Sequence, residues 1–388
     1  MQKRGAFVPQ KLLLVFASNL ILCTSMAAGQ FGKPTCYKTP GISGAVVAGD
    51  FNNDNILDLA ATSVDHNTVS ILLGNGDGTF RKGGKFGIGS GSFPYRMATG
   101  DFNHDGNLDL LTVNLTSGNL SVLLGKGDGT FRKAENFVAG GGPSGVVVGD
   151  FNEDGKLDLA VSDQSTTKIN ILLGNGDGTF QMLHGYDTEL GPVSLTEGDF
   201  NNDGNLDLVS VSATTGDASL LLGNGDGTFQ SAKNFGANYI DPVWVTAGDL
   251  NGDKNLDLVV VDFTSTVSVF LGNGNGSFRK PKDYAAGRSG DYLLQASLDD
   301  FNGDGVLDLA VSDSGDQDGA GAALSLLLGN SNGTFRHVKE FHAGKFPGYI
   351  ATGRFTSGSF PDVAITGARG VCVLLNTDTG MREGIPGR

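Results

Sequence analysis

The sequence lacks most of the features that mark helical, nucleic-acid-binding or catalytic proteins. No stretch after the N-terminus repeats apolar residues with a helical period, which argues against a helical fold. Lys and Arg number 27 against 42 Asp and Glu, and the net charge of −15 makes nucleic acid and anionic membrane surfaces poor partners. The five histidines are scattered, and no nucleophile elbow, zinc signature or phosphate loop accompanies them.

Long apolar runs are also missing, except for one at the N-terminus. Basic residues precede the apolar run 12–22 and small residues follow it, so residues 1–29 are predicted to be a secretory signal peptide. A retained membrane anchor and a lipoprotein attached through Cys23 are the two alternatives. No second apolar segment follows. We therefore expect no membrane span after signal removal and a secreted, periplasmic or cell-surface location.

The sequence is rich in glycine, and much of that glycine belongs to a repeat. The motif Gly-Asp-Phe-Asn-x-Asp-Gly-x-Leu-Asp-Leu recurs every 49 to 54 residues. Its first aspartate is found at Asp50, Asp101, Asp150, Asp199, Asp249 and Asp300. A second motif, Leu-Leu-Gly-Asn-Gly-Asp-Gly-Thr-Phe, follows each copy and predicts a hairpin turn. Each period thus holds four strand-like runs, here called A to D, which is the layout of a propeller blade.

The two ends of the repeat region indicate a closed ring. Residues 31–37 match strand D of the other periods, whereas the seventh period ends soon after its strand C, near Leu375. The N-terminal strand would therefore complete the last blade, an arrangement for which an open solenoid has no need. The sequence predicts an all-β fold, a seven-bladed β-propeller of four-stranded antiparallel blades, formed by residues 30–388 as one domain. We expect a monomer.

The few cysteines fit the same closure. Cys23 would leave with the signal, and alignment of the strands places Cys36 and Cys372 opposite each other in the C–D hairpin of the last blade. Directly opposite Cβ atoms of an antiparallel pair lie within disulfide range. We therefore expect a Cys36–Cys372 disulfide, with two unpaired strand cysteines as the alternative.

The loop between strands A and B has the composition of a calcium site. Asp, Asn, Asp and Asp occupy its positions 1, 3, 5 and 9, and position 7 can add a backbone carbonyl. Calcium binds about six to eight oxygen ligands, and three carboxylates on one turn repel each other without a cation. Alternatively, these side chains only cap the turn through backbone hydrogen bonds. We expect up to six structural Ca²⁺ ions.

The predicted calcium ligands recur in six loops. They are Asp50, Asn52, Asp54, Ile56 and Asp58; Asp101, Asn103, Asp105, Asn107 and Asp109; Asp150, Asn152, Asp154, Lys156 and Asp158; Asp199, Asn201, Asp203, Asn205 and Asp207; Asp249, Asn251, Asp253, Asn255 and Asp257; and Asp300, Asn302, Asp304, Val306 and Asp308. The seventh loop carries Arg354 at position 1 and keeps only Asp362 at position 9. We expect no metal there, and an Arg354–Asp362 ion pair instead.

These acidic loops, each followed by the glycine-rich hairpin, resemble the FG-GAP and VCBS repeats. That family includes the integrin α-subunit propeller and many bacterial secreted proteins. The resemblance spans about residues 30–378. It implies calcium at Asp50, Asn52, Asp54, Asp58 and their counterparts, and ligand binding on the face opposite the calcium loops.

A ligand face is expected where the chain enters the innermost strands. Tyr95, Arg96, Trp244 and Tyr349 lie there, and aromatic and Arg side chains suit a sugar or a peptide. The same residues could instead plug the central channel. We expect a secreted binding scaffold for an extracellular glycan or protein. The alternative is an extracellular polysaccharide lyase or hydrolase, for which His66 would join Tyr95, Arg96 and Tyr349.

Overall fold

Strands alone make up the regular structure of the described residues. The computed structural model describes residues 30–181, 184–236, 241–288, 290–316, 318–319, 321–368 and 370–377. The predicted signal peptide, residues 1–29, lies outside these ranges. Within them, no helix is long and apolar enough to cross a membrane.

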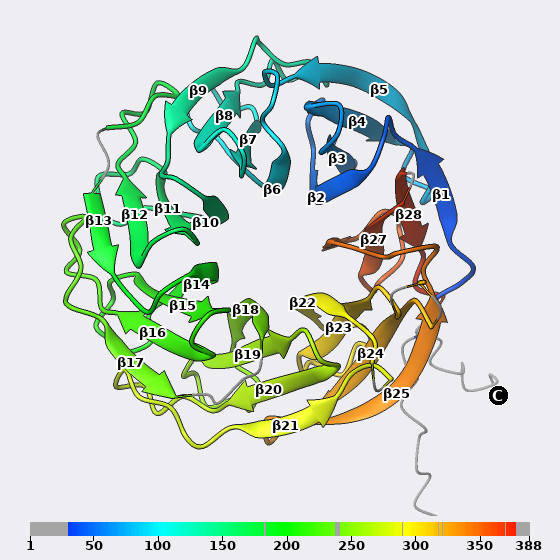
Figure 1. The fold of residues 1–388 in the computed structure, drawn as a ribbon. Coiled ribbons are helices and arrows are strands. Elements are labelled where there is room, and N and C mark those ends of the chain that lie inside the picture. Colours follow the sequence, from blue (N-terminus) through cyan, green and yellow to red (C-terminus); the bar gives the residue numbers. More distant parts are fainter. Residues whose placement is uncertain are drawn as a thin grey trace, which may run out of the picture.

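The described strands form seven four-stranded antiparallel sheets arranged as a ring (Figure 1). Blade one comprises β2 (Ser43–Gly49), β3 (Asp58–Ser63), β4 (Thr68–Gly74) and β5 (Phe80–Gly87). Blade two comprises β6 (Pro94–Gly100), β7 (Asp109–Asn114), β8 (Asn119–Leu123) and β9 (Glu135–Val138). Blade three comprises β10 (Pro143–Gly149), β11 (Asp158–Asp163), β12 (Lys168–Leu172) and β13 (His184–Asp187). Blade four comprises β14 (Pro192–Gly198), β15 (Asp207–Ser212), β16 (Asp217–Leu221) and β17 (Lys233–Gly236).

The remaining blades follow the same order. Blade five comprises β18 (Pro242–Gly248), β19 (Asp257–Asp262), β20 (Thr266–Phe270) and β21 (Lys282–Ala285). Blade six comprises β22 (Leu293–Asp299), β23 (Asp308–Asp313), β24 (Ala323–Asn330) and β25 (Thr334–His342). Blade seven comprises β26 (Ile350–Gly353), β27 (Asp362–Gly367), β28 (Gly370–Leu374) and, from the N-terminus, β1 (Thr35–Lys38). The predicted seven-bladed propeller is confirmed.

The N-terminal strand closes the ring as the sequence predicted. β1 pairs antiparallel with β28, and the two lie side by side in Figure 1 although they come from opposite ends of the chain. Cys36 is the register partner of Cys372, and a disulfide joins them across 336 residues of sequence. Ser70 and Lys85, which stand at the places of Cys372 and Cys36 in blade one, are register partners as well.

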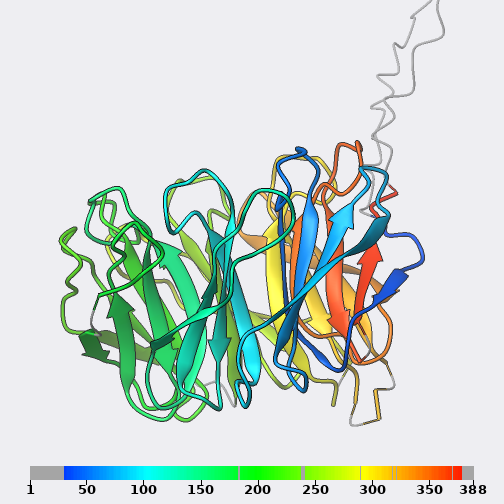
Figure 2. The same ribbon diagram turned by 90° about the horizontal axis from the view of Figure 1, so that it is seen from above.

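The core lies between the blades. Every residue of the B strands, such as β3 and β11, is buried, because neighbouring blades cover both faces of each sheet. The outer strands, such as β9 and β17, are mostly exposed. Phe51, Phe301 and Phe355, at position 2 of their A–B loops, are among the largest fully buried side chains. Each of these phenylalanines anchors a loop on the core. Seen edge-on, strands run between two loop-bearing faces (Figure 2).

Candidate functional sites

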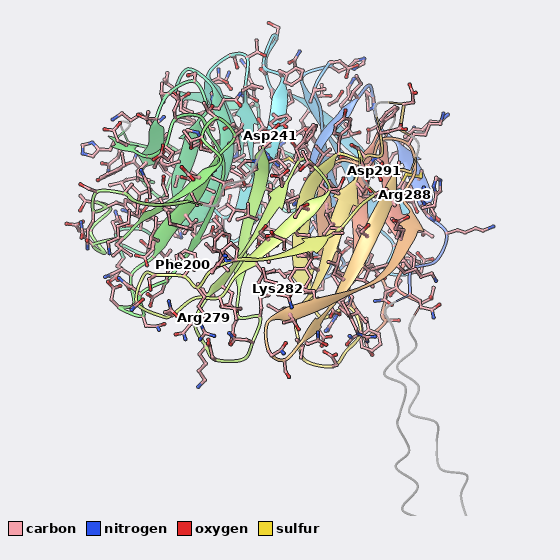
Figure 3. All side chains as sticks on the ribbon, turned by 60° about the horizontal axis from the view of Figure 1, so that its bottom comes forward. Phe200, Asp241, Arg279, Lys282, Arg288 and Asp291 are labelled. Carbon is pink, nitrogen blue, oxygen red and sulfur yellow. A yellow bond between two sulfur atoms is a disulfide. The ribbon has the colours of Figure 1, made fainter. Side chains whose placement is uncertain are left out.

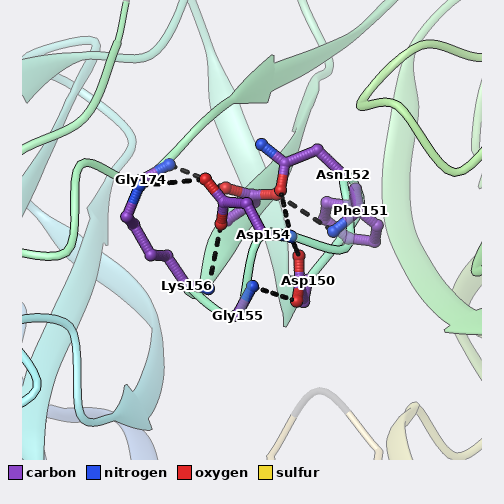
Figure 4. A network of polar contacts seen from close by, with 8 residues as sticks. Asp150, Phe151, Asn152, Asp154, Gly155, Lys156 and Gly174 are labelled. Atoms are coloured by element: carbon purple, nitrogen blue, oxygen red, sulfur yellow. Dashed lines mark hydrogen bonds and ion pairs between the residues drawn. The ribbon is translucent and has the colours of Figure 1, made fainter.

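The six acidic loops share one hydrogen-bonded geometry, shown for blade three in Figure 4. The backbone N–H of Asp154 donates to Oδ1 of Asp150 and to Oδ1 of Asn152, both at 3.1 Å. The N–H of Gly155 donates to Oδ2 of Asp150 at 2.8 Å, and that of Lys156 to Oδ1 of Asp154 at 3.0 Å. Equivalent bonds recur in the other five loops. The oxygens of positions 1, 3 and 5 therefore gather around one turn.

The turn requires left-handed backbone at two positions. At position 6 four loops have glycine, while Asn55 and Lys254 adopt φ of 63° and 68°. Lys254 thus takes the same conformation as its counterparts despite its side chain. Position 4 is left-handed as well, and there His104 and Glu153 have φ of 56° and 57°. The repeated motif did not predict this second left-handed residue.

The aspartate at position 9 is fully buried and accepts two backbone hydrogen bonds. In blade three, Oδ2 of Asp158 accepts from the N–H of Phe151 at 3.0 Å, and Oδ1 accepts from the N–H of Gly174 at 2.7 Å. The first bond fixes the A–B loop and the second fixes the start of the C–D turn. Burial raises the pKa of Asp58 to about 6 and that of Asp308 to about 7. The two backbone hydrogen bonds oppose this rise, and the carboxylates at positions 5 and 1 add to it.

The donor set of these loops fits a hard divalent cation. Each loop offers three carboxylates and an amide oxygen, the ligand type that calcium prefers. Burial is the main cause of the raised pKa of Asp109 and Asp207 at position 9, and the carboxylates at positions 5 and 1 add to the rise. Across the described ranges, no three Asp, Glu, His or Cys side chains converge as tightly as a bound metal requires. Backbone N–H groups hold the oxygens in place instead. Calcium therefore stays a prediction.

One loop contains a competing cation. Nζ of Lys156, at position 7 in blade three, lies 3.0 Å from Oδ2 of Asp154 (Figure 4). The side chain of Lys156 thus neutralises part of the charge that a metal would bind, while the sequence had assigned this residue only a backbone role. Position 7 is asparagine in three other loops, at Asn107, Asn205 and Asn255.

The predicted Arg354–Asp362 ion pair does not form. Asp362 is fully buried, and its oxygens accept from the N–H groups of Phe355 at 2.9 Å and Asn376 at 2.7 Å. Arg354 is exposed. Burial raises the pKa of Asp299, and the guanidinium of Arg354 is one of the groups that oppose this rise. Asp362 thus makes the two backbone bonds of position 9 in a loop that has lost its other acidic residues.

The four residues of the predicted ligand face meet around the centre of the ring. The guanidinium carbon of Arg96 lies 5.1, 4.6 and 4.3 Å from the ring centroids of Tyr95, Trp244 and Tyr349, respectively. These residues come from blades two, five and seven. Arg96 and Tyr349 are buried, whereas Tyr95 and Trp244 are half-buried. Only Tyr95 and Trp244 therefore retain surface that a ligand could contact, while Arg96 and Tyr349 fill the centre.

The same register position ties neighbouring inner strands together. Nε of Arg96 donates to the carbonyl of Ser144 in the next blade at 3.3 Å. The amide of Gln295 accepts from the N–H of Ile350 and donates to its carbonyl, at 2.7 and 3.2 Å. Oγ of Ser194 accepts from the N–H of Val245 at 3.3 Å. These polar side chains bridge blades, a role that their spacing alone did not reveal.

The face opposite the acidic loops carries exposed apolar residues. In the described part of the chain, four of the five large exposed apolar side chains lie in D–A loops, namely Ile42, Phe93, Leu190 and Phe346. Ile42, Phe93 and Phe346 occupy the same place, eight residues before the first loop position, in three consecutive blades. Phe93 and Phe346 also have φ of 50°, a strained value for a bulky residue.

Backbone bonds place the D–A loops beside the B–C turns. The N–H of Val64 donates to the carbonyl of Ile42, and that of Leu115 to the carbonyl of Phe93. Both kinds of connection therefore lie at the strand ends opposite the A–B loops. One face of the ring is thus repetitive and acidic, and the other is variable and partly apolar.

The fold and its six matching loops define a repeat propeller with one conserved type of acidic turn. The family model of the FG-GAP-like repeat matches residues 50–112, 105–161, 151–210, 199–260 and 249–311. Since these matches cover more than half of the chain, the protein belongs to the FG-GAP-like repeat family. No curated protein matches it.

Solved propellers share the architecture at low sequence identity. The BBS1N structure in complex with ARL6DN aligns with a TM-score of 0.63 and 13% identity over 90% of this chain and 98% of that chain. An Agrocybe aegerita lectin that recognises non-reducing terminal N-acetylglucosamine aligns with a TM-score of 0.58 and 19% identity, over 87% and 86%. A streptogramin B lyase aligns with a TM-score of 0.62 and 14% identity, over 90% and 98%. At these identities the likeness concerns the fold.

Proposed function

We propose that this protein is a secreted, calcium-stabilised propeller that acts as a binding scaffold for an extracellular glycan or protein. The observation that carries the proposal is the contrast between the two faces. The A–B loops repeat one geometry, whereas the D–A loops expose Ile42, Phe93, Leu190 and Phe346 at a cost in solvation and, at Phe93, in backbone strain. Exposed apolar side chains grouped on one face are typical of interaction sites.

Calcium would be held by the side chains at positions 1, 3, 5 and 9 of the first six loops and by the carbonyl at position 7. Its contribution is charge neutralisation, because each loop brings three carboxylates to one turn. The loops lie on the face away from the exposed apolar residues, so we assign calcium a structural role.

An extracellular location is supported by the disulfide between Cys36 and Cys372, since such bonds persist outside the reducing cytosol. The signal peptide predicted at residues 1–29 agrees with this location. The partner is an extracellular glycan or protein. Both classes occur among the structural relatives, in the lectin and in the BBS1N complex. We propose a monomer that spans no membrane after signal removal.

The polysaccharide lyase or hydrolase alternative finds little support in the site. A catalytic base needs a pKa near the working pH. Burial instead raises the pKa of Tyr349 far above its usual range. Arg96 is buried under three rings, and His66 lies on a B–C turn with its Nδ1 3.1 Å from Asp65. These candidates do not form a reactive group on the surface.

A glycan array and a pull-down of extracellular proteins test the binding function. The double variant F93N/F346N should reduce capture by at least about tenfold, since hot-spot aromatics dominate such interfaces. Asn tolerates the left-handed backbone, so the variant should fold. The control V138N removes an exposed apolar residue from the end of an outer strand and should leave capture unchanged. Release of unsaturated product from uronic-acid polymers would overturn the proposal in favour of a lyase.

A further inference from the structure

The junction between blades four and five differs from the other junctions of the ring. At six of the seven, an aromatic residue of strand D meets the phenylalanine of the next hairpin edge-to-face, with interplanar angles of 74° to 88°. At the seventh, the rings of Phe235 and Phe278 are 5.1 Å apart and tilted by only 32°. The packing of this one junction is therefore rearranged.

A single residue explains the rearrangement. Phe270 stands where the other blades carry leucine at the end of strand C: Leu72, Leu123, Leu172, Leu221, Leu327 and Leu374. Its ring centroid lies 5.9 Å from that of Phe235 and 6.5 Å from that of Phe278. The extra ring prevents the edge-to-face pair that a leucine would allow.

A cavity of about 350 Å³ opens beside these rings on the outer rim. Its apolar wall consists of Leu220, Phe235, Phe270 and Phe278, and its rim carries Lys233, Arg279 and Lys280. In Figure 3, Arg279 and Lys282 lie on this outer side of the ring. A volume of this order is typical of sites for small molecules.

The rim is cationic in an otherwise acidic protein. Among the described residues, no carboxylate lies within ion-pair distance of Lys233, Arg279 or Lys280. The net charge of the chain is −15, and these three cations give the rim of the cavity the opposite sign. Nε of Arg279 is instead 3.4 Å from Oδ1 of Asn273.

The neutral polar groups of the cavity are already engaged. The amide of Asn234 bonds to Glu189 and to Oγ of Ser219. Oγ of Ser277 donates to Oδ1 of Asn275 at 2.6 Å and accepts from Asn273. A sugar with many hydroxyls would leave hydrogen bonds unmade here, which is costly. An apolar group with one negative charge matches both the aromatic wall and the cationic rim.

We propose that this cavity binds a small carboxylate that bears an aromatic or alkyl group. The ring or chain packs on Phe235, Phe270 and Phe278, and the carboxylate pairs with Arg279 and Lys280. The site lies on the outer rim, away from the exposed apolar face. It adjoins the acidic loop of blade four, where the N–H of Gly276 donates to the carbonyl of Phe200 at 2.9 Å. The proposal does not depend on the proposed function, and either can fail alone.

Fluorine NMR of 4-fluorophenylacetate with the full calcium-supplemented protein tests the proposal. The probe should broaden and shift, while 4-fluorobenzyl alcohol, which lacks the charge, should bind at least about tenfold more weakly. Acetate, which lacks the ring, should not displace the probe. Equal competition by acetate would reduce the site to general charge attraction and overturn the proposal. Peptides ending in Phe, with a free or an amidated C-terminus, show whether a chain end or only a free carboxylate fits.

The chain supplies its own matched variants. R279Q/K280S introduces the residues that blade four carries at these places, Gln230 and Ser231, so it should fold. It should weaken probe binding about tenfold or more. The control R132Q/K133S makes the same change at the junction of blades one and two, where Phe86 and Phe131 pack edge-to-face, and should bind like the wild type. Equal loss in both variants, or no loss in the first, contradicts the assignment.

Discussion

The aspartate at position 9 shows how one residue can serve two purposes. In six blades it belongs to an acidic loop, and in all seven its two oxygens accept backbone N–H groups from the A–B loop and from the chain just after strand C. Asp362 makes these bonds without the other acidic residues. The backbone role is therefore independent of any metal, and it explains why aspartate remains in a loop that lost the rest of the motif.

Substitutions at two positions should separate the two roles. D362A leaves two buried N–H groups without partners, and we expect it to lower the free energy of unfolding by about 2–5 kcal/mol, whether or not calcium is present. D150A removes a half-buried acid at position 1 that also accepts two backbone N–H groups, and it should lower stability more in calcium than in EGTA. Urea unfolding in calcium and in EGTA measures both. A calcium-dependent effect of D362A would contradict the separation.

Asp313 should make stability depend on pH. Asp313 is fully buried, and this burial is the main cause that raises its pKa to about 7. The carboxylates of Asp291 and Glu340 add to the rise, and a hydrogen bond from the N–H of Gly315 opposes it. A raised pKa means that the folded state holds the proton more tightly than the unfolded state. Its contribution is complete below about pH 4 and is lost as the pH rises through about 7, by up to about 1.4 kcal/mol per pH unit.

The variant D313N removes this titration. Blade two has Asn114 at the same place, so the amide is compatible with the strand end. In saturating calcium, the difference in unfolding free energy between D313N and the wild type should grow in favour of D313N from about pH 4 to about pH 7. A difference that stays constant across this range refutes the assignment.

At the scale of elements, the strands and their register followed from the sequence because the repeat supplied seven comparisons. The permuted ends fixed which strands pair, and the alignment of β1 with β5 placed Cys36 opposite Cys372. The left-handed residue at position 6 could be predicted from glycine. The left-handed conformation at position 4 could not be predicted, because His104 and Glu153 are not residue types that indicate a positive φ.

Features that depend on the placement of individual side chains escaped prediction for a physical reason. A contact such as Lys156 with Asp154 depends on side-chain reach, and the bridge from Gln295 to Ile350 depends on how inner strands face each other. The prediction of an Arg354–Asp362 ion pair was wrong because sequence spacing does not show that the carboxylate of Asp362 is buried. Ile42, Phe93 and Phe346 stand at equal positions in their blades, which the sequence alone shows. That these side chains are exposed is seen only in the structure.

The closing blade gives a prediction at this scale. C36S/C372S keeps the β1–β28 pairing but removes a cross-link around 336 residues, worth at most about 6 kcal/mol by chain entropy. We expect a lower melting temperature and faster hydrogen exchange in β1 than in β9 or β17, which are outer strands without a cross-link. Exchange in β1 that is unchanged by the substitution would show that pairing alone holds the closure.

At the scale of the whole molecule, the ring separates two tasks. The acidic loops and the disulfide stabilise one closed scaffold, while the variable loops of the opposite face and the rim cavity between blades four and five are free to differ from blade to blade. Repetition thus supplies stability, and departures from repetition, such as Phe270 and Phe93, mark the places where we propose binding.

Calorimetric melting with and without calcium tests the central claim most directly. Extracellular calcium sites with dissociation constants of about 0.1–1 mM each add roughly 0.4–1.4 kcal/mol at about 1 mM calcium. Six such sites predict that EGTA lowers the melting temperature by roughly 3–11 °C, and that excess calcium, but not magnesium, restores it. An unchanged melting temperature in EGTA would show that the acidic loops are held by their backbone hydrogen bonds alone.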